Sequence, residues 1–313
     1  MSRPQRIRIG TRASQLALVQ AEWVGGRIRE LVPEADVELV RISTKGDRIL
    51  DVPLARVGGK GLFVKEIEEA LLDGRIDLAV HSMKDVPAVL PAALHIAVVP
   101  EREVPQDAFV SRKFAGLDEL PRGATLGTSS LRRKAQLLAL RPDLDLRDLR
   151  GNVGTRLQKL DRGDFDAIML AAAGLRRLGL EARITANMAP ETMLPAVGQG
   201  ALGIEMRRSD AVLLERILPL HHAETAVTVA AERAFLTRLE GGCQVPIGAY
   251  ATLHAGRVEL SGLIATADGK TVLRETRSSA RSGAENLGRE LAEALLARGG
   301  RAILEAVYQG PLS

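Results

Sequence analysis

The order of strand-like and helix-like segments at the start of the chain is the strongest constraint on its fold. Residues 6–11 alternate apolar and polar side chains, as a strand does, and 14–31 then follow a helical pattern. Further strands are expected over 37–43 and 76–82, with a helix over 62–72 between them. Right-handed crossovers join strands in such a β-α-β-α-β order. The pattern therefore predicts an α/β lobe with a parallel sheet.

The same pattern restarts after a charged stretch between Pro100 and Pro105, which suits a hinge or linker. A second α/β lobe is expected there, and Ala201–Met206 is a later strand. The expected strands of the second lobe are 108–111, 125–128, 145–149 and 165–171, and its helices are 130–140 and 154–160.

The last third of the chain has a different pattern. Three strands follow one another without intervening helices, and one helix lies on each side of them. This order predicts a small α+β domain with an antiparallel sheet. A chain of 313 residues is expected to form two or three domains. The segments are a helix over 224–239, strands over 247–252, 258–265 and 271–278, and a helix over 284–297.

Composition narrows the class of protein. No apolar run approaches the ~18 residues of a membrane span, and the first residues lack the apolar core of a signal peptide. With a single cysteine and hence no internal disulfide, a cytoplasmic location is expected. Of the 43 basic residues 35 are Arg, which binds carboxylates and phosphates bidentately, although codon usage or heat adaptation would also explain the excess. Aromatic residues make up 3%, too few for the stacking surfaces of single-strand nucleic-acid binders.

Three familiar motifs do not carry the function. Residues 198–203 match the dinucleotide pattern G-x-G-x-x-G, but a strand follows them where a helix should begin. The glycines of 58–61 lack the spacing and the hydroxyl residue of a phosphate loop. The five histidines show no metal-ligand spacing, and no metal site is expected.

Polar residues gather at the expected carboxyl ends of strands, where α/β sheets bind ligands. Ser82, Lys84 and Asp85 follow the third strand, and Pro87 keeps them on a loop; the alternative is a solvated Lys-Asp turn. The hydroxyls of Thr128, Ser129 and Ser130 are placed to cap a helix and hold an anion. The arginines that recur after strands are Arg12, Arg132, Arg133, Arg150, Arg156 and Arg177.

Two further segments stand out. Residues 43–61 are glycine-rich, charged and too long for a simple connection, which favours a mobile lid. Cys243 follows two glycines and precedes Pro246, so it is expected on a bent loop. A free cysteine is most often an inert buried thiol.

Seven segments together resemble the hydroxymethylbilane synthase (porphobilinogen deaminase) family, in order, over essentially the whole chain. They contain Ile9-Gly10-Thr11-Arg12, Val57–Phe63, His81–Pro87, Gly127–Arg133, Leu149–Val153, Leu194–Gly200 and Gly241–Pro246.

The resemblance implies a three-domain fold. Domains 1 and 2 would be similar to the two lobes of type II periplasmic anion-binding proteins, and domain 3 would be a small α+β domain with a three-stranded antiparallel sheet. The implied boundaries are 1–99 plus 200–220, 105–193, and 222–313. It also implies a monomer that joins four porphobilinogen molecules into linear hydroxymethylbilane with loss of ammonia. A dipyrromethane cofactor, built from substrate, would be bound through a thioether to Cys243.

The resemblance also assigns roles to residues. Asp85 would be catalytic, because its carboxylate can stabilise the cation left when ammonia departs and can accept protons. Phe63 and Gln199 would line the substrate pocket, and Lys60 would belong to the lid. The cofactor and substrate carboxylates would be bound by Arg12, Ser82, Lys84, Thr128, Ser129, Ser130, Arg132, Arg133, Arg150, Arg156 and Arg177.

Two other classes of protein remain open at this point. A two-lobed anion-binding or effector-sensing module without chemistry would fit the first two domains, but it would leave Cys243 and the third domain without a role. A nucleic-acid binder would fit the Arg content, but the net charge of +4 and the few aromatic residues oppose it.

Overall fold

The computed structural model describes residues 6–48, 64–241 and 245–309. Its contacts divide the chain into two compact units. Unit 1 comprises residues 1–103 and 201–226, and unit 2 comprises residues 104–200 and 227–313. The chain therefore leaves unit 1, forms the first part of unit 2, and returns to complete unit 1.

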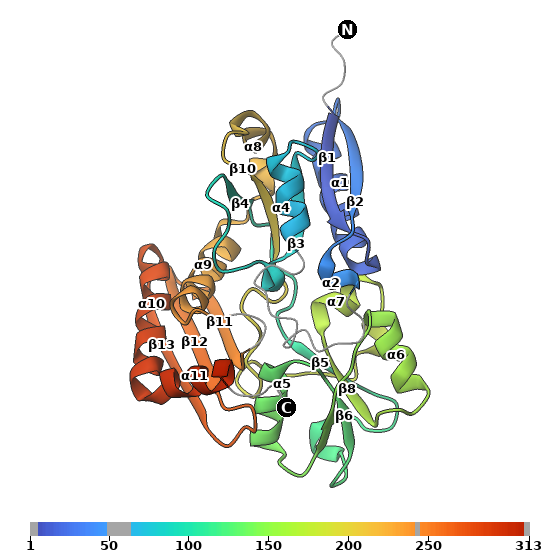
Figure 1. Cartoon of the computed structure of the whole chain (residues 1–313), viewed down its shortest axis with the longest axis vertical. Coiled ribbons are helices and arrows are strands. Elements are labelled where there is room, and N and C mark those ends of the chain that lie inside the picture. Colours follow the sequence, from blue (N-terminus) through green and yellow to red (C-terminus); the bar gives the residue numbers. More distant parts are fainter. Residues whose placement is uncertain (1–5, 49–63, 242–244, 310–313) are drawn as a thin grey trace. The chain divides into compact units, whose positions relative to one another are not determined.

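Unit 1 is built on one five-stranded sheet with the order β2-β1-β3-β10-β4 (Figure 1). The strands β1 (Arg6–Arg12), β2 (Asp36–Ile42) and β3 (Leu78–Ser82) are parallel, as predicted. The other two, β10 (Leu202–Arg207) and β4 (Leu94–Val98), pair antiparallel. The sequence predicted β10 as a strand without a direction, and β4 was not foreseen. Because Leu202 pairs with Ser82, the returning chain starts at the carboxyl end of β3 and must run the opposite way.

Helix α1 (Gln15–Leu31) begins where Ser14 caps it, since the Ser14 hydroxyl accepts a hydrogen bond of 3.3 Å from the Ala17 N–H. Its buried face, which includes Val24 and Ile28, packs on strand residues such as Ile9 in the main core of the unit. Of the predicted lid segment only the part up to Arg48 lies among the described residues. The other helices of unit 1 are α2 (Lys45–Arg48), α4 (Lys65–Leu72) and α8 (Ala211–Ile217).

The first sheet of unit 2 repeats the pairing scheme of unit 1. Its order is β7-β6-β8-β5-β9, with two parallel pairs followed by two antiparallel pairs. The predicted second lobe is confirmed, although α7 and β9 were not foreseen. The strands are β5 (Asp107–Ser111), β6 (Thr125–Gly127), β7 (Asp145–Arg147), β8 (Ala167–Ala171) and β9 (Ala186–Asn187), and the helices are α5 (Leu131–Leu140), α6 (Val153–Asp161) and α7 (Ala172–Arg177).

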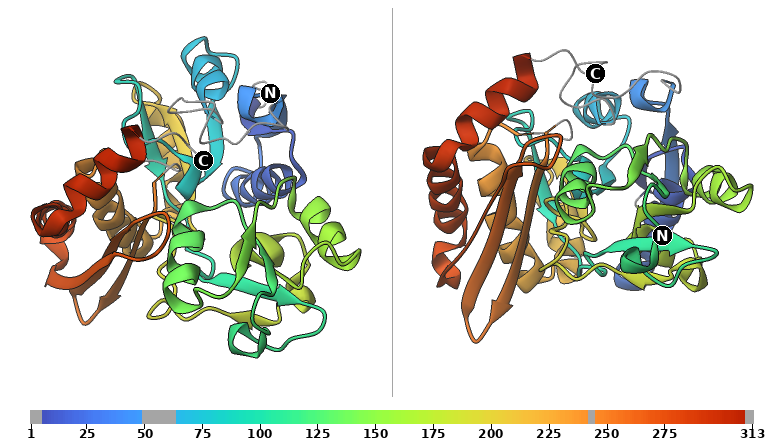
Figure 2. Two further views of the ribbon diagram at one scale, coloured as in Figure 1. Left: turned by 60° about the horizontal axis from the view of Figure 1, so that its bottom comes forward. Right: turned by 90° about the horizontal axis from the view of Figure 1, so that it is seen from below.

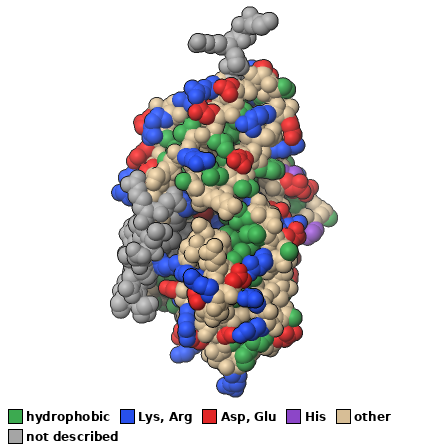
Figure 3. All heavy atoms as spheres, turned by 90° about the vertical axis from the view of Figure 1, so that its right-hand side faces the viewer, with side chains coloured by type: hydrophobic (Ala, Val, Ile, Leu, Met, Phe, Trp, Pro, Cys, Tyr) green, Lys and Arg blue, Asp and Glu red, His purple; other side chains and the backbone are tan. Residues whose placement is uncertain are grey.

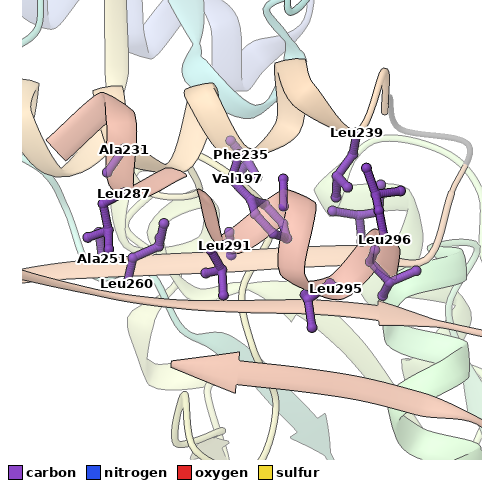
Figure 4. Packing of buried hydrophobic residues seen from close by; sticks show 14 of the residues in the cluster. Val197, Ala231, Phe235, Leu239, Ala251, Leu260, Leu287, Leu291, Leu295 and Leu296 are labelled. Carbon is purple, nitrogen blue, oxygen red and sulfur yellow. The ribbon is translucent and has the colours of Figure 1, made fainter. Parts of the chain in front are cut away.

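The C-terminal part of unit 2 is a three-stranded antiparallel sheet covered by helices, as Figures 1 and 2 show. Phe235 of α9 and Leu291 of α10 lie in its core (Figure 4). A Cβ atom at Gly262 would come within 2.7 Å of the Phe235 ring, so a larger residue there would displace this packing. The elements are β11 (Ile247–His254), β12 (Arg257–Ala265), β13 (Val272–Ala280), α9 (Ala223–Arg238), α10 (Ala284–Leu295) and α11 (Arg301–Gln309).

The two sheets of unit 2 are linked by packing. Leu263 and Ala265 on the other face of β12 form a small core with Ala135 of α5 and with Leu194. At the β12–β13 turn, a Cβ atom on Gly269 would lie 2.4 Å from the Ala135 carbonyl oxygen. The two-lobe and α+β fold class is confirmed. The boundary between domains 2 and 3 stays a prediction, because both fall within unit 2.

Two further observations concern the distribution of surface charge and whether any helix could cross a membrane. On the face drawn in Figure 3, basic and acidic side chains are interspersed and do not gather in patches of one sign. Along the described ranges, no helix is both long enough and apolar enough to cross a membrane.

Candidate functional site

A small pocket of about 60 Å³ lies in unit 1 beside the carboxyl ends of β1 and β3. It brings together three predicted site residues, Arg12, Ser82 and Asp85. Gln20 of α1 also lines it, and its amide and the Ser82 hydroxyl are within hydrogen-bonding distance, with Nε2 3.0 Å from Oγ. Among the described residues, the pocket therefore combines a guanidinium, a carboxylate, the imidazole of His81 and neutral hydrogen-bonding groups.

Asp85 lies on a short 3₁₀ turn, Met83–Asp85, instead of the open loop that was predicted. The turn is fixed where the Met83 N–H donates to the Ala201 carbonyl, at 3.0 Å, and it ends at Val86, which is extended because a proline follows. Asp85 is half-buried, and none of the described residues forms a hydrogen bond or ion pair with its carboxylate. Lys84, on the same turn, is not among the pocket-lining residues.

His81, in β3 directly before this turn, forms a buried pair with Glu205 that the sequence did not predict. His81 Nε2 is 2.9 Å from Oε2 of Glu205 on β10, and the two side chains are 3% and 1% exposed. Glu68 of α4 is nearby, and one oxygen each of Glu68 and Glu205 is buried without a hydrogen-bond partner among the described residues. Burial, and then the negative charge of Glu205, raise the pKa of Glu68 above its ordinary value. His81, Glu68 and Glu205 thus lie together, and the two carboxyl groups outnumber the one imidazole.

In unit 2 the predicted hydroxyl cluster caps a helix, as expected. The Ser130 hydroxyl accepts from the Arg133 N–H at the start of α5, and Thr128 Oγ1 accepts from the Ser130 N–H. In these two bonds the hydroxyls accept, which leaves their own O–H groups to donate. The Ser129 hydroxyl is 3.0 Å from both the carbonyl oxygen and the N–H nitrogen of Leu149. It therefore ties this turn to the segment after β7.

Arg132 and Arg133 are buried around one carboxylate, Asp107, at the start of β5. Arg132 Nη1 donates to Asp107 Oδ2 at 2.7 Å, and Arg133 donates to Oδ1 through Nε at 3.0 Å and Nη2 at 2.7 Å. Gln199 Nε2 donates to the same oxygen at 2.9 Å. Although burial alone would raise the pKa of Asp107, the two guanidinium groups hold it well below its ordinary range.

The side chains of two other predicted arginines of unit 2, Arg156 and Arg177, donate hydrogen bonds to backbone carbonyls. Arg156 Nε donates to the Gly151 carbonyl at 2.8 Å, and Arg177 Nη2 donates to the Gly200 carbonyl at 2.7 Å. Arg150 is half-buried, and its backbone carbonyl accepts a hydrogen bond from the Lys159 side chain. All three side chains are partly accessible, unlike Arg132 and Arg133.

Cys243, Phe63 and Lys60 lie outside the described residues. The backbone on each side of Cys243 is described. Glu240 has a left-handed φ of 53°, and a Cβ atom at Gly241 would come within 2.7 Å of the Ile247 side chain. The chain therefore bends at Glu240, directly after α9, and Val245 is buried, at 3% exposed.

Two family models match this chain. The model described as "Porphobilinogen deaminase, dipyromethane cofactor binding domain" matches residues 7–215, and "Porphobilinogen deaminase, C-terminal domain" matches residues 226–297. The chain belongs to the porphobilinogen deaminase family.

Curated relatives agree with this family assignment. The porphobilinogen deaminase of Pelobacter propionicus is 57% identical over 306 residues, which cover 98% of each chain. That of Syntrophotalea carbinolica is 58% identical over 301 residues, which cover 96% of each chain. The predicted family, the deaminating transferase class and the dipyrromethane cofactor are thereby confirmed. The non-catalytic binding module is not favoured.

A solved structure of a nutrient-binding protein from Burkholderia cenocepacia bound to methionine is similar at a lower level. Its TM-score is 0.43 at 16% identity, covering 68% of this chain and 90% of that chain. A likeness of this size is too small to support an argument about the site.

Proposed function

We propose that this member of the porphobilinogen deaminase family joins four porphobilinogen molecules head to tail into hydroxymethylbilane, releasing one ammonia per addition. The family assignment supports the reaction. Within unit 1, the observation that carries the proposal is the pocket that gathers Arg12, Ser82 and Asp85, whose carboxylate has no partner among the described residues.

The residues present fit a dipyrromethane group. Such a group carries several carboxylates and pyrrole N–H donors, and when bound it supplies a covalent primer for chain growth. Asp85 would accept from the pyrrole N–H groups, and the guanidinium and hydroxyl donors match the carboxylates. Cys243 would form the thioether, and the carboxylate-binding residues would be Arg12, Ser82, Lys84, Thr128, Ser129, Ser130, Arg132, Arg133, Arg150, Arg156 and Arg177.

Asp85 would be the catalytic residue. When ammonia leaves porphobilinogen, positive charge develops on the substrate, and a carboxylate about 4 Å away at an effective dielectric of about 20 supplies roughly 4 kcal/mol. That corresponds to roughly a thousandfold in rate if the gain appears only as the charge develops. The same carboxylate would accept the ring proton that is lost after coupling. The absence of a described partner keeps its charge available for both tasks.

The substrate side would be completed by Gln199, Phe63 and the Lys60 lid. The Gln199 amide is held by the Pro105 carbonyl, at 2.7 Å, and by Asp107. These roles rest on the motif matches, and in the described residues Gln199 is almost fully buried.

Intact-protein mass tests the proposal most directly. The purified wild-type chain should exceed its sequence mass by two linked pyrrole units, and Cys243→Ala should lose the whole excess. It should also fail to gain the excess when porphobilinogen is added. A wild-type mass equal to that of the bare sequence, before and after porphobilinogen, would contradict the proposed function.

We also propose that the protein acts as a cytoplasmic monomer. The single cysteine precludes an internal disulfide, which is usual for proteins of reducing compartments. Sedimentation equilibrium should give a mass near 33.6 kDa at micromolar concentration; a dimer mass would contradict the monomer.

A further inference from the structure

The Asp107 cluster differs from the rest of the predicted site, because its residues are bonded chiefly to one another. Asp107 has no exposed surface, and Arg132, Arg133 and Gln199 are each less than a tenth exposed. All three residues that contact its carboxylate are predicted to bind cofactor or substrate. Asp107 itself stood out in no motif.

The bonds fix the orientation of both guanidinium groups. Arg132 is held on one side by Asp107 and on the other by the Leu194 carbonyl, at 2.7 Å from Nη1. Arg133 is held by Asp107 and by the Met169 carbonyl, at 2.9 Å. Each side chain therefore bridges Asp107 and a backbone carbonyl, and neither can rotate without breaking a buried hydrogen bond.

Arg132 and Arg133 have N–H donors that the bonds to Asp107 and to the backbone carbonyls do not use. A guanidinium has five N–H donors, and the bonds to Asp107 and the carbonyls use three of them on each arginine. Arg132 Nε is buried and has no hydrogen-bond partner among the described residues. The cluster carries one net positive charge, since two guanidinium groups share one carboxylate. It is thus a partly neutralised, pre-oriented cation site.

The cluster also lies where the chain enters and leaves this part of unit 2. Asp107 is three residues after the entry at Val104, and Gln199 is one residue before the exit at Gly200. The Gln199 amide bridges Asp107 and the Pro105 carbonyl, so the two passing segments are tied together at this carboxylate. Any displacement of Asp107 would move the arginines and both segments together.

We propose that Asp107 is a positioning residue for carboxylate binding, which holds Arg132 and Arg133 in the orientation that loads the cofactor and retains the substrate. This role rests on the proposed function. Asp107 touches neither group in it and acts through the two arginines. Preorganisation of this kind lowers the entropic cost of ordering the two long side chains when a carboxylate binds.

Asp107→Asn tests the role. Its amide would direct a donor at Arg132 Nη1, which releases that arginine while the volume is preserved. The rate of cofactor loading, followed by intact mass after porphobilinogen is added to the freshly folded chain, should fall at least about tenfold. In the protein that does load, the KM for porphobilinogen should rise by a larger factor than kcat falls.

Asp143→Asn is the matched control. Asp143 also pairs with an arginine of unit 2, Arg141, at 2.8 Å, but it contacts none of the predicted site residues. Its loading rate and KM should equal those of the wild type. If Asp107→Asn fails to fold, Asp107→Glu, which restores the charge but displaces the oxygens, takes its place and should load at an intermediate rate.

The outcomes separate this role from the proposed function. A wild type that loads, together with a folded Asp107 variant that loads equally fast, would show that Asp107 does not position the arginines. Failure of both Asp107 variants to fold would make its role structural only, and would equally overturn the proposal. A wild type that never acquires the cofactor mass would contradict the proposed function and this role with it.

Discussion

The predicted site residues of the two units differ in how far neighbouring residues bury and pair with them. In unit 1, Asp85 lies half-buried on a short turn, and no described residue neutralises it. In unit 2, Arg132 and Arg133 are buried, and both form ion pairs with Asp107. In the proposed roles, the group that would meet charge developing during the reaction is left available, whereas the groups that would bind permanent charges are fixed beforehand.

Glu68 of unit 1, which is partly buried, and Asp107 of unit 2, which is fully buried, have pKa values shifted in opposite directions. Asp107 has two cationic partners, and its pKa is lowered. Glu68 has no guanidinium among the causes of its shift, and its pKa is raised by burial and then by the negative charge of Glu205. Burial raises the pKa of a carboxyl, and the sign is reversed where cationic partners outweigh burial, as they do at Asp107.

The largest expected effect is on the turnover of Asp85→Asn. Removing the charge should lower kcat by roughly a thousandfold, because about 4 kcal/mol of transition-state stabilisation is lost. Stability should change by less than about 0.5 kcal/mol, as expected for an accessible side chain. Ammonia release and thermal unfolding measure the two quantities, with Asp73→Asn, an exposed carboxylate of unit 1, as the control. Near-normal turnover would remove the contrast between the units.

Replacing one arginine by methionine in each unit tests whether the arginines of unit 2 are held more firmly than Arg12 of unit 1. Arg133→Met leaves Asp107 with one guanidinium instead of two and should cost about 3 kcal/mol, lowering the melting temperature by roughly 5–10 °C. Arg12→Met, at a half-buried position of unit 1, should lower it by no more than about 2 °C. Differential scanning calorimetry of both variants decides the point. Equal shifts would mean that the arginines of unit 2 are no more preorganised than Arg12.

The smallest expected effect concerns the pH dependence of stability. Since the pKa of Glu68 is raised in the folded state, the stability it contributes is complete below its ordinary pKa, near 4.3, and is lost as pH rises through the folded value. Glu68→Gln should therefore melt about 1–3 °C above the wild type at pH 8 and at the same temperature near pH 4. Glu22→Gln, at an exposed position of α1, removes a charge that does not contribute to the Glu68 shift and should show no such dependence. A gain that is equal at both pH values would point to packing instead of charge.

Asp107 should show the opposite sign. Its stabilising contribution is present above the ordinary pKa of an aspartate and is lost only as pH falls through its lowered value. Glu68 and Asp107 thus make opposite contributions to the pH dependence of stability.

Local patterns predicted most elements of the fold, and the motifs named Arg12, Ser82 and Asp85 of the residues that line the pocket of unit 1, but not Gln20. They did not predict Asp107 or Glu205. Asp107 follows Pro105-Gln106 at the start of an apolar strand, and the partners of its carboxylate are 25, 26 and 92 residues away. Glu205 lies inside the strand Leu202–Arg207, 124 residues from His81. A buried ionic partner leaves no periodic signal, because only the folded chain brings it near.

The antiparallel direction of β10 was missed for a related reason. Local pattern identifies a strand but contains no information about its direction in a sheet. That direction followed from where the chain returns to unit 1, which is set by the course of the intervening residues through unit 2.

The late return of β10 also fixes an order of events during synthesis of the chain. When residues 6–98 have left the ribosome, β3 has one paired edge and one open edge, because its other neighbour begins at Leu202. The strands of the first sheet of unit 2, all between Asp107 and Asn187, are complete before that neighbour exists. The nascent chain therefore finishes its second sheet before its first, and the apolar edge of β3 stays open to wrong partners in the meantime.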